Sequence, residues 1–169
     1  MIYSTSSNSK STNLNPMDSE VLNKLARYCA YQERCISEIK QKIYELNAEA
    51  DSDTYIQWLQ ENNYLNESRF VGLYIRSKFN QKKWGRGKIH FELRKKGISD
   101  SEIQLHCEVI AEEDYAEALK NLLVKKAESL KTGTSAEKYQ KCYRTGLAKG
   151  FEPGLVSQVL KGLFPKGFA

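Results

Sequence analysis

Apolar residues recur every three or four positions from about residue 18 onward, which is the spacing of one face of an α-helix. Prolines stand only at positions 16, 153 and 165, so a stretch of 136 residues contains none. That stretch is rich in Leu, Lys, Glu and Ala, which favour helix, and it contains no Asn-Gly or Asp-Gly pair of the kind that closes a β-hairpin. The pattern predicts an all-α protein.

The spacing of the apolar positions predicts nine helices. Their expected ranges are 18–33, 37–47, 52–62, 67–80, 87–96, 100–113, 114–130, 135–149 and 153–163. The supporting boundary signals are Asn66 as an N-cap, Ser99 with Glu102 and Thr134 with Glu137 as capping boxes, Pro153 in a first turn, and Gly97 and Gly150 as left-handed helix stops. The expected helices therefore begin and end where short polar or glycine-containing segments interrupt the pattern.

The nine helices fall into three similar groups. Taking Ile56, Ile103 and Val156 as equivalent gives periods of 47 and 53 residues, which suit a three-helix repeat. Within this scheme, Ile89 and Leu93 before Gly97 correspond to Tyr143 and Leu147 before Gly150. Chance periodicity among helices is the alternative explanation. The hypothesis is three tandem three-helix, helix-turn-helix-like repeats that stack into a curved, elongated body.

This interpretation divides the chain into four parts. Residues 1–17 are rich in Ser, Asn and Thr and lack apolar periodicity, so a disordered N-terminal tail is expected there. The three repeats are expected at residues 18–65, 66–113 and 114–169.

Positive charge is concentrated in the expected middle repeat. Between Arg69 and Lys96 the chain carries ten basic side chains and one acid, Glu92, a balance of +9 in a chain whose net charge is +5. The remaining residues therefore sum to −4. A basic concentration of this kind predicts a polyanionic or acidic partner, although a solvated helix face opposite a core stripe would show the same pattern.

The turn between the two basic helices, residues 81–87, contains Gly85 and Gly87. Glycines leave backbone amides free at the start of a helix, where the dipole favours anions. A phosphate or a carboxylate could then lie beside Lys83 and Arg86. In the same region, Phe91 is an aromatic ring among cations, either covered by a neighbouring repeat or acting as a contact anchor.

Several classes of chemistry lack the residues they need. The four cysteines (Cys29, Cys35, Cys107 and Cys142) form no C-x-x-C pair, and there are only two histidines, so neither a metal site nor a disulfide framework is expected. No catalytic constellation, cofactor motif or small-molecule site is recognisable. No apolar run is long enough to span a bilayer or to form a secretory signal, so a soluble, cytoplasmic protein without membrane contact is expected.

The middle repeat resembles the RecX family, regulators of the bacterial RecA recombinase. The matching residues are Leu65-Asn66-Glu67, Arg69-Phe70, Tyr74, Arg76-Ser77, Lys83-Trp84-Gly85, Ile89, Glu92-Leu93 and Lys96-Gly97-Ile98. Residues of the third repeat fit more loosely, and Val71 stands where the family usually has alanine. The resemblance implies an all-α protein of three tandem three-helix units that binds RecA and its nucleoprotein filament.

Two functional hypotheses are open, the first implied by the resemblance to RecX and the second by the basic helix pair. The first is a non-catalytic regulator that binds RecA or RecA–DNA filaments, with weak DNA binding, and that inhibits ATPase, recombination and strand exchange. The expected RecA- or DNA-binding surface consists of Arg69, Arg76, Lys78, Lys82, Lys83, Arg86, Lys88, Phe91, Arg94, Lys95 and Lys96. The second is a helix-turn-helix-like nucleic-acid-binding protein that acts through phosphate contacts made by the helix at 87–96.

Overall fold

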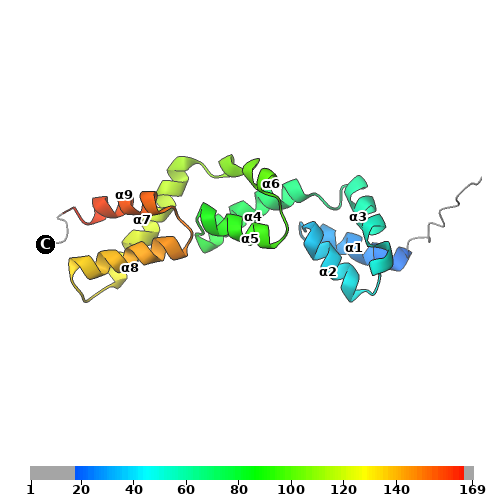
Figure 1. The fold of residues 1–169 in the computed structure, drawn as a ribbon, viewed down its shortest axis with the longest axis horizontal. Helices are drawn as coiled ribbons and strands as arrows, with labels where there is room; N and C mark the ends of the chain where they lie inside the picture. Colours follow the sequence, from blue (N-terminus) through cyan, green and yellow to red (C-terminus); the bar gives the residue numbers. More distant parts are fainter. Residues whose placement is uncertain (1–17, 166–169) are drawn as a thin grey trace, which may run out of the picture.

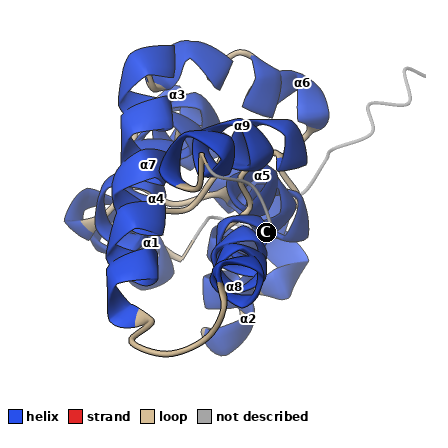
Figure 2. Cartoon of the chain, turned by 90° about the vertical axis from the view of Figure 1, so that its left-hand side faces the viewer, coloured by secondary structure: helices blue, strands red, loops and turns tan. Residues whose placement is uncertain are grey.

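The computed structural model describes residues 18–165, and every regular element within that range is helical (Figures 1 and 2). The N-terminal unit comprises α1 (Ser19–Tyr31), α2 (Ile36–Glu45) and α3 (Ser52–Glu61). The middle unit comprises α4 (Glu67–Lys82), α5 (Arg86–Lys95) and α6 (Asp100–Gln104). The C-terminal unit comprises α7 (Glu112–Ser129), α8 (Ser135–Ala148) and α9 (Pro153–Leu163).

The three units follow one another along the long axis of an elongated body (Figure 1). This arrangement confirms the predicted all-α class and the tandem three-helix architecture. The proposed tail at residues 1–17 lies outside the described residues. No helix among the described residues is long and apolar enough to cross a membrane.

Helix ends follow the predicted capping chemistry, except that Ser99 accepts from the Glu102 amide without the reciprocal bond of a full capping box. The Asn66 side chain accepts a hydrogen bond from the Arg69 amide at the start of α4, and Thr134 with Glu137 forms a complete capping box at the start of α8. Pro153 occupies the first turn of α9. These contacts satisfy amides that have no partner inside the helix, which is why the boundaries could be predicted from the sequence.

The second helix of every unit ends in a left-handed residue. Gly97 has φ +83° and Gly150 has φ +87°, as the sequence predicted, and Asn47 has φ +54° after α2. Asn is the residue other than glycine that tolerates this conformation best. The same stop therefore recurs in all three units, although the N-terminal unit makes it without glycine.

The predicted correspondence between residues of α5 and α8, the second helices of the middle and C-terminal units, was wrong by one residue. Counting back from the left-handed stops, Ile89 and Leu93 correspond to Cys142 and Gly146, which are buried, whereas Leu147 is 38% exposed. The space left by the missing side chain of Gly146 is filled by Val156, since a Cβ there would lie 2.8 Å from a Val156 methyl carbon.

The predicted helix at 100–113 was too long. The structure has α6, then a 3₁₀ turn at Cys107–Val109, and α7 already begins at Glu112. Ile110 has an extended backbone (φ −116°, ψ 119°) and is buried. Burying this side chain in the core requires the chain to leave the helical path, which a continuous helix would not allow.

The α4 helix buries more than one of its sides. Phe70, Val71, Ile75 and Phe79 are buried, whereas Leu73 is 52% exposed. The helix is in contact with neighbours on more than one side, so a single amphipathic stripe does not describe it.

The described residues form two hydrophobic cores, and only one of them extends across two units. One core lies within the N-terminal unit and includes Leu25, Ile39 and Leu59. The other runs continuously through the middle and C-terminal units and also takes in Cys35. The middle and C-terminal units therefore share apolar burial, whereas the N-terminal unit joins them through Cys35 and the polar contacts described below.

Candidate functional site

Two of the predicted surface cations lie at the junction with the N-terminal unit. The Arg69 guanidinium donates to Glu33 at 2.9 Å, and the Lys96 ammonium donates to Glu38 at 2.7 Å. Partial burial acts to lower the pKa of Lys96, but the hydrogen bond and charge of Glu38 outweigh it and raise this pKa. Both cations thus already have carboxylate partners, and they brace the two units against each other.

A third predicted cation lies at the junction with the C-terminal unit. The guanidinium of Arg86 makes a bidentate contact with Glu112, at 2.7 and 3.1 Å. The hydrogen bond to Glu112 raises the pKa of Arg86, and the same hydrogen bond lowers the pKa of Glu112. The backbone amide of Arg86 donates to the hydroxyl of Tyr115 at 2.9 Å. This tyrosine is fully buried, and burial raises its pKa.

The glycine turn before α5 is an interface between units, and the expected anion site is absent from it. The Gly85 amide donates to the Lys149 carbonyl at 2.7 Å, and the Gly87 amide donates to the Gly150 carbonyl at 3.0 Å. A Cβ on Gly85 would lie 2.4 Å from the carbonyl carbon and oxygen of Gly150. The glycines therefore allow two backbones to meet, and the amides expected to hold a phosphate are already bonded.

The other predicted cations are more accessible. Arg76 and Lys82 are exposed, and their side chains have no ion-pair partner among the described residues. Lys83 is exposed beside the Phe79 ring, with its ammonium 5.8 Å from the ring centroid. Arg94 contacts Asp100 at 3.4 Å.

Two lysines and a tryptophan form a local cation–π cluster at the end of α4. The ammonium of Lys78 lies 5.6 Å from the centroid of Trp84, and that of Lys88 lies 4.9 Å from it. Trp84 is half-buried and packs against the shared core. The indole ring attracts both ammonium groups through its electron-rich face.

Phe91 is 60% exposed. Neither neighbouring unit covers the ring, so the prediction that a neighbouring repeat buries Phe91 was wrong. The ammonium of Lys95 lies 5.6 Å from the ring centroid and 3.9 Å from the carboxylate of Glu92. An exposed aromatic ring among cations is suited to contact with a partner.

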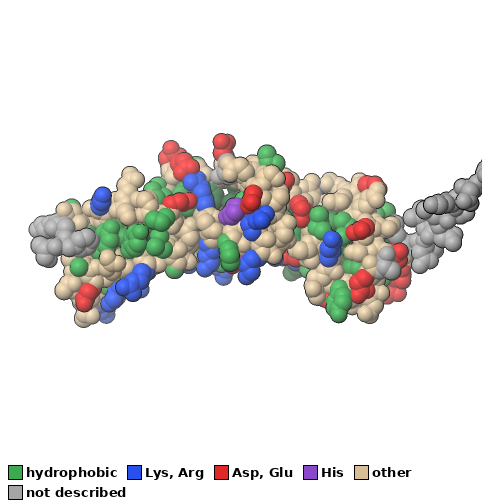
Figure 3. All heavy atoms as spheres, viewed as in Figure 1, with side chains coloured by type: hydrophobic (Ala, Val, Ile, Leu, Met, Phe, Trp, Pro, Cys, Tyr) green, Lys and Arg blue, Asp and Glu red, His purple; other side chains and the backbone are tan. Residues whose placement is uncertain are grey.

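The basic character of the C-terminal unit was missed. Residues 114–165 carry nine basic and five acidic side chains, whereas residues 18–65 carry five basic and nine acidic ones. Lys141 and Arg144 are exposed on α8, and Lys149 donates to the Lys82 carbonyl at 2.9 Å. Counting charge separately for each repeat would have found this surface. Figure 3 shows blue side chains along the lower side of the middle and C-terminal units, while several red ones line the upper edge.

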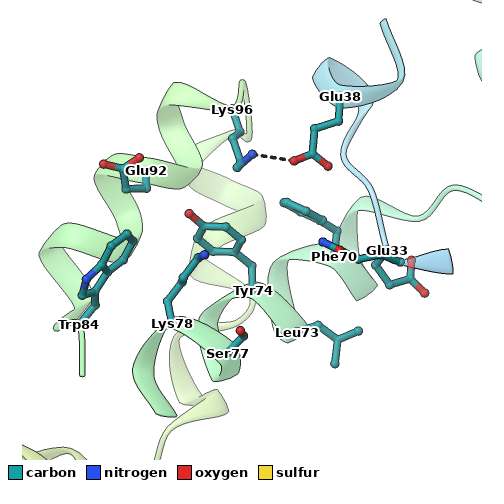
Figure 4. A pocket seen from close by; sticks show the side chains of 11 residues that line it. Glu33, Glu38, Phe70, Leu73, Tyr74, Ser77, Lys78, Trp84, Glu92 and Lys96 are labelled. Carbon is teal, nitrogen blue, oxygen red and sulfur yellow. Dashed lines mark hydrogen bonds and ion pairs between the residues drawn. The ribbon is translucent and has the colours of Figure 1, made fainter. Parts of the chain in front are cut away.

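A groove of about 640 Å³ lies between the N-terminal and middle units (Figure 4). Its lining residues come from the α1–α2 connection, α2, α4 and α5, with Trp84 from the turn before α5 and Lys96 directly after it. They include three carboxylates (Glu33, Glu38 and Glu92), three aromatic rings (Phe70, Tyr74 and Trp84) and two ammonium groups (Lys78 and Lys96). Burial raises the pKa of Tyr74, whose hydroxyl has no hydrogen-bond partner among the described residues.

The described residues contain no group of three or more His, Cys, Asp or Glu side chains that could hold a metal ion. His90 contacts Asp100 at 2.9 Å, and His106 lies 2.9 Å from the hydroxyl of Ser68. Cys29, Cys35 and Cys142 are buried free thiols, and burial raises the pKa of Cys29 to about 11.

Comparison with known protein families gives two matches to RecX. Residues 66–105 match the second three-helix domain of RecX, and residues 112–160 match the third. Together the two matches cover more than half of the 169 residues, and they correspond to the middle and C-terminal units.

Relatives and solved structures agree with this match. A protein named Regulatory protein RecX from Escherichia coli (strain SMS-3-5 / SECEC) is 33% identical over 101 residues, covering 53% of this chain and 60% of the relative. A protein of the same name from Clostridium perfringens is 30% identical over 130 residues, covering 75% of this chain and 60% of the relative. The match thus spans about 60% of the length of each relative.

The crystal structure of RecX from Lactobacillus salivarius has the same fold, with a TM-score of 0.77 at 24% identity, covering 86% of this chain and 95% of that one. A second crystal structure of a regulatory protein RecX gives a TM-score of 0.76, also at 24% identity, covering 83% of this chain and 71% of that one. With both three-helix domain matches and this shared fold in place, the chain belongs to the RecX family.

Proposed function

We propose that this protein is a non-catalytic regulator that binds RecA or RecA–DNA filaments and inhibits their ATPase, recombination and strand-exchange activities. The observation that carries the proposal is the match of the middle and C-terminal units to RecX domains, whose relatives are named regulatory proteins. The elongated body supports it, since three units in a row can touch several subunits of a filament at once. Multiple weak contacts of this kind add up through effective concentration.

The charge distribution suggests how the units share the task. The basic middle and C-terminal units would face DNA phosphates or acidic protein surface, and the acidic N-terminal unit would face elsewhere. Arg76, Lys82 and Lys83 are the most suitable contacts in the middle unit, because no carboxylate among the described residues neutralises them. Phe91, next to Lys95, would add apolar contact area elsewhere on the middle unit.

A groove-reading helix-turn-helix protein is less well supported. Such proteins insert the N-terminal residues of the recognition helix among base edges. Here the amides of Gly85 and Gly87, at the start of α5, are bonded to the α8–α9 turn. DNA contact by this chain would therefore use exposed side chains, and it would weaken steeply as salt is raised.

The test is the DNA-dependent ATPase activity of the cognate RecA with increasing amounts of this protein. Wild type is expected to reduce the activity, and the double charge reversal R76E/K82E is expected to lose most of that effect. The matched control is R27E/K40E in the N-terminal unit, where both side chains are exposed and the net charge changes equally. An ATPase activity unchanged by wild type would refute the proposed function. Equal inhibition by both variants would show that Arg76 and Lys82 do not contribute to the inhibition.

A further inference from the structure

The groove between the N-terminal and middle units is lined partly by carboxylates, unlike the exposed surface that carries Arg76, Lys82 and Lys83. Three carboxylates line it, Glu33 and Glu38 from the N-terminal unit and Glu92 from α5. Glu33 and Glu38 are paired with cations of the middle unit. Glu92 is paired more loosely, with the ammonium of Lys95 one turn away on the same helix, at 3.9 Å. Of the three carboxylates, Glu92 is therefore the one most available to a cationic ligand.

The aromatic rings of this groove already hold positive charges. The ammonium of Lys78 lies 4.9 Å from the centroid of Tyr74 and 5.6 Å from that of Trp84. The ammonium of Lys96 lies 6.0 Å from the Tyr74 centroid. Figure 4 shows Lys78 reaching up from α4 between the two rings. The electron-rich ring faces are thus positioned to receive cations.

Lys78 is the cation in this cluster that can be displaced. It has no carboxylate partner among the described residues, whereas Lys96 is hydrogen-bonded to Glu38 at 2.7 Å. Its side chain is long and flexible, so moving it out of the groove breaks no hydrogen bond that the structure shows. The Tyr74 hydroxyl and the indole N–H of Trp84 also lack hydrogen-bond partners among the described residues, so they are available to a ligand.

We propose that this groove receives an arginine side chain from a segment of a partner protein. The guanidinium takes the place of the Lys78 ammonium between Tyr74 and Trp84 and donates to the carboxylate of Glu92. Guanidinium suits the site better than ammonium because it is planar, stacks on aromatic rings and pairs with carboxylates bidentately. The inference rests on the proposed function only for the identity of that partner.

The site can be tested by NMR with the tripeptide acetyl-Gly-Arg-Gly-amide as the probe. The indole N–H resonance of Trp84 reports on the groove, and that of Trp58, which is stacked on Tyr64 in the N-terminal unit, is an internal control. The tripeptide is expected to shift the Trp84 resonance and leave that of Trp58 in place. The matched tripeptide with citrulline, which has nearly the same shape but no charge, is expected to shift neither.

Two variants give effects of opposite sign. E92Q removes the carboxylate partner, so the dissociation constant for the arginine tripeptide should rise about 5-fold. K78M removes the competing ammonium, so the same constant should fall about 3-fold. An anion site would behave in the reverse way, because K78M would then remove an attraction.

Three results would overturn the proposal. The first is equal shifts from the arginine and citrulline tripeptides. The second is a short oligo(dT) that shifts Trp84 and binds more weakly to K78M, which would assign the groove to nucleic acid. The third is a Trp84 shift that depends on protein concentration without any probe, which would assign it to a second copy of this chain. Because the titration contains no RecA, it tests arginine binding in the groove even if the ATPase activity of RecA proves insensitive to this protein.

Discussion

The contact between Gly85 and the α8–α9 turn leads to the sharpest stability prediction. In Gly85→Ala the new Cβ would lie 2.4 Å from the Gly150 carbonyl, and only a movement of one backbone away from the other can relieve this overlap. That movement lengthens two hydrogen bonds, from Gly85 to Lys149 and from Gly87 to Gly150. Each bond contributes about 1 kcal/mol, of which lengthening forfeits about half, and overpacking of this kind costs about 1–3 kcal/mol. The sum is an expected loss of about 2–4 kcal/mol.

The measurement is urea unfolding followed by circular dichroism. With a slope of about 1–3 kcal/mol per molar urea, the midpoint should fall by roughly 1–2 M. The control is Gly162→Ala in α9, where no heavy atom lies within 4 Å of the added Cβ. This control should be neutral or stabilising by up to about 1 kcal/mol, because alanine is the better helix former. A midpoint for Gly85→Ala equal to that of wild type would refute the close approach of the two backbones.

Three further predictions concern the contacts between units. Tyr115→Phe removes the acceptor of the Arg86 amide and should cost about 1–3 kcal/mol in the same urea assay; an unchanged midpoint would contradict the role of this hydroxyl. Arg86 lowers the pKa of Glu112, so their pairing stabilises the fold above the ordinary value of 4.5 and is lost as pH falls through the lowered pKa. Glu112→Gln should therefore show a smaller loss of stability than wild type on acidification, as followed by thermal unfolding at several pH values. A double-mutant cycle of Glu38→Gln and Lys96→Met should give a coupling of about 1 kcal/mol or less in the free energy of unfolding, and this coupling should shrink in high salt. If the effects of the two substitutions are additive at low salt, this ion pair does not stabilise the junction between the N-terminal and middle units.

Local signals account for the parts of the fold that were predicted correctly. The left-handed stops at Gly97 and Gly150 and the cap at Asn66 depend on one residue and its near neighbours in sequence. Such features can be found without knowing what the helix packs against. The helix predicted at 100–113 failed for the opposite reason, because burying Ile110 in the shared core overrides the local preference to continue the helix.

The candidate site shows the same division. The sequence alone determined that positive charge gathers between Arg69 and Lys96, because that count needs no coordinates. Only the tertiary structure decided which of these charges are neutralised, since Glu33, Glu38 and Glu112 come from other helices. It also decided that Gly85 serves backbone contact between units. Pairing over long sequence separations depends on how the units stack, and a periodic pattern of helices carries no information about that.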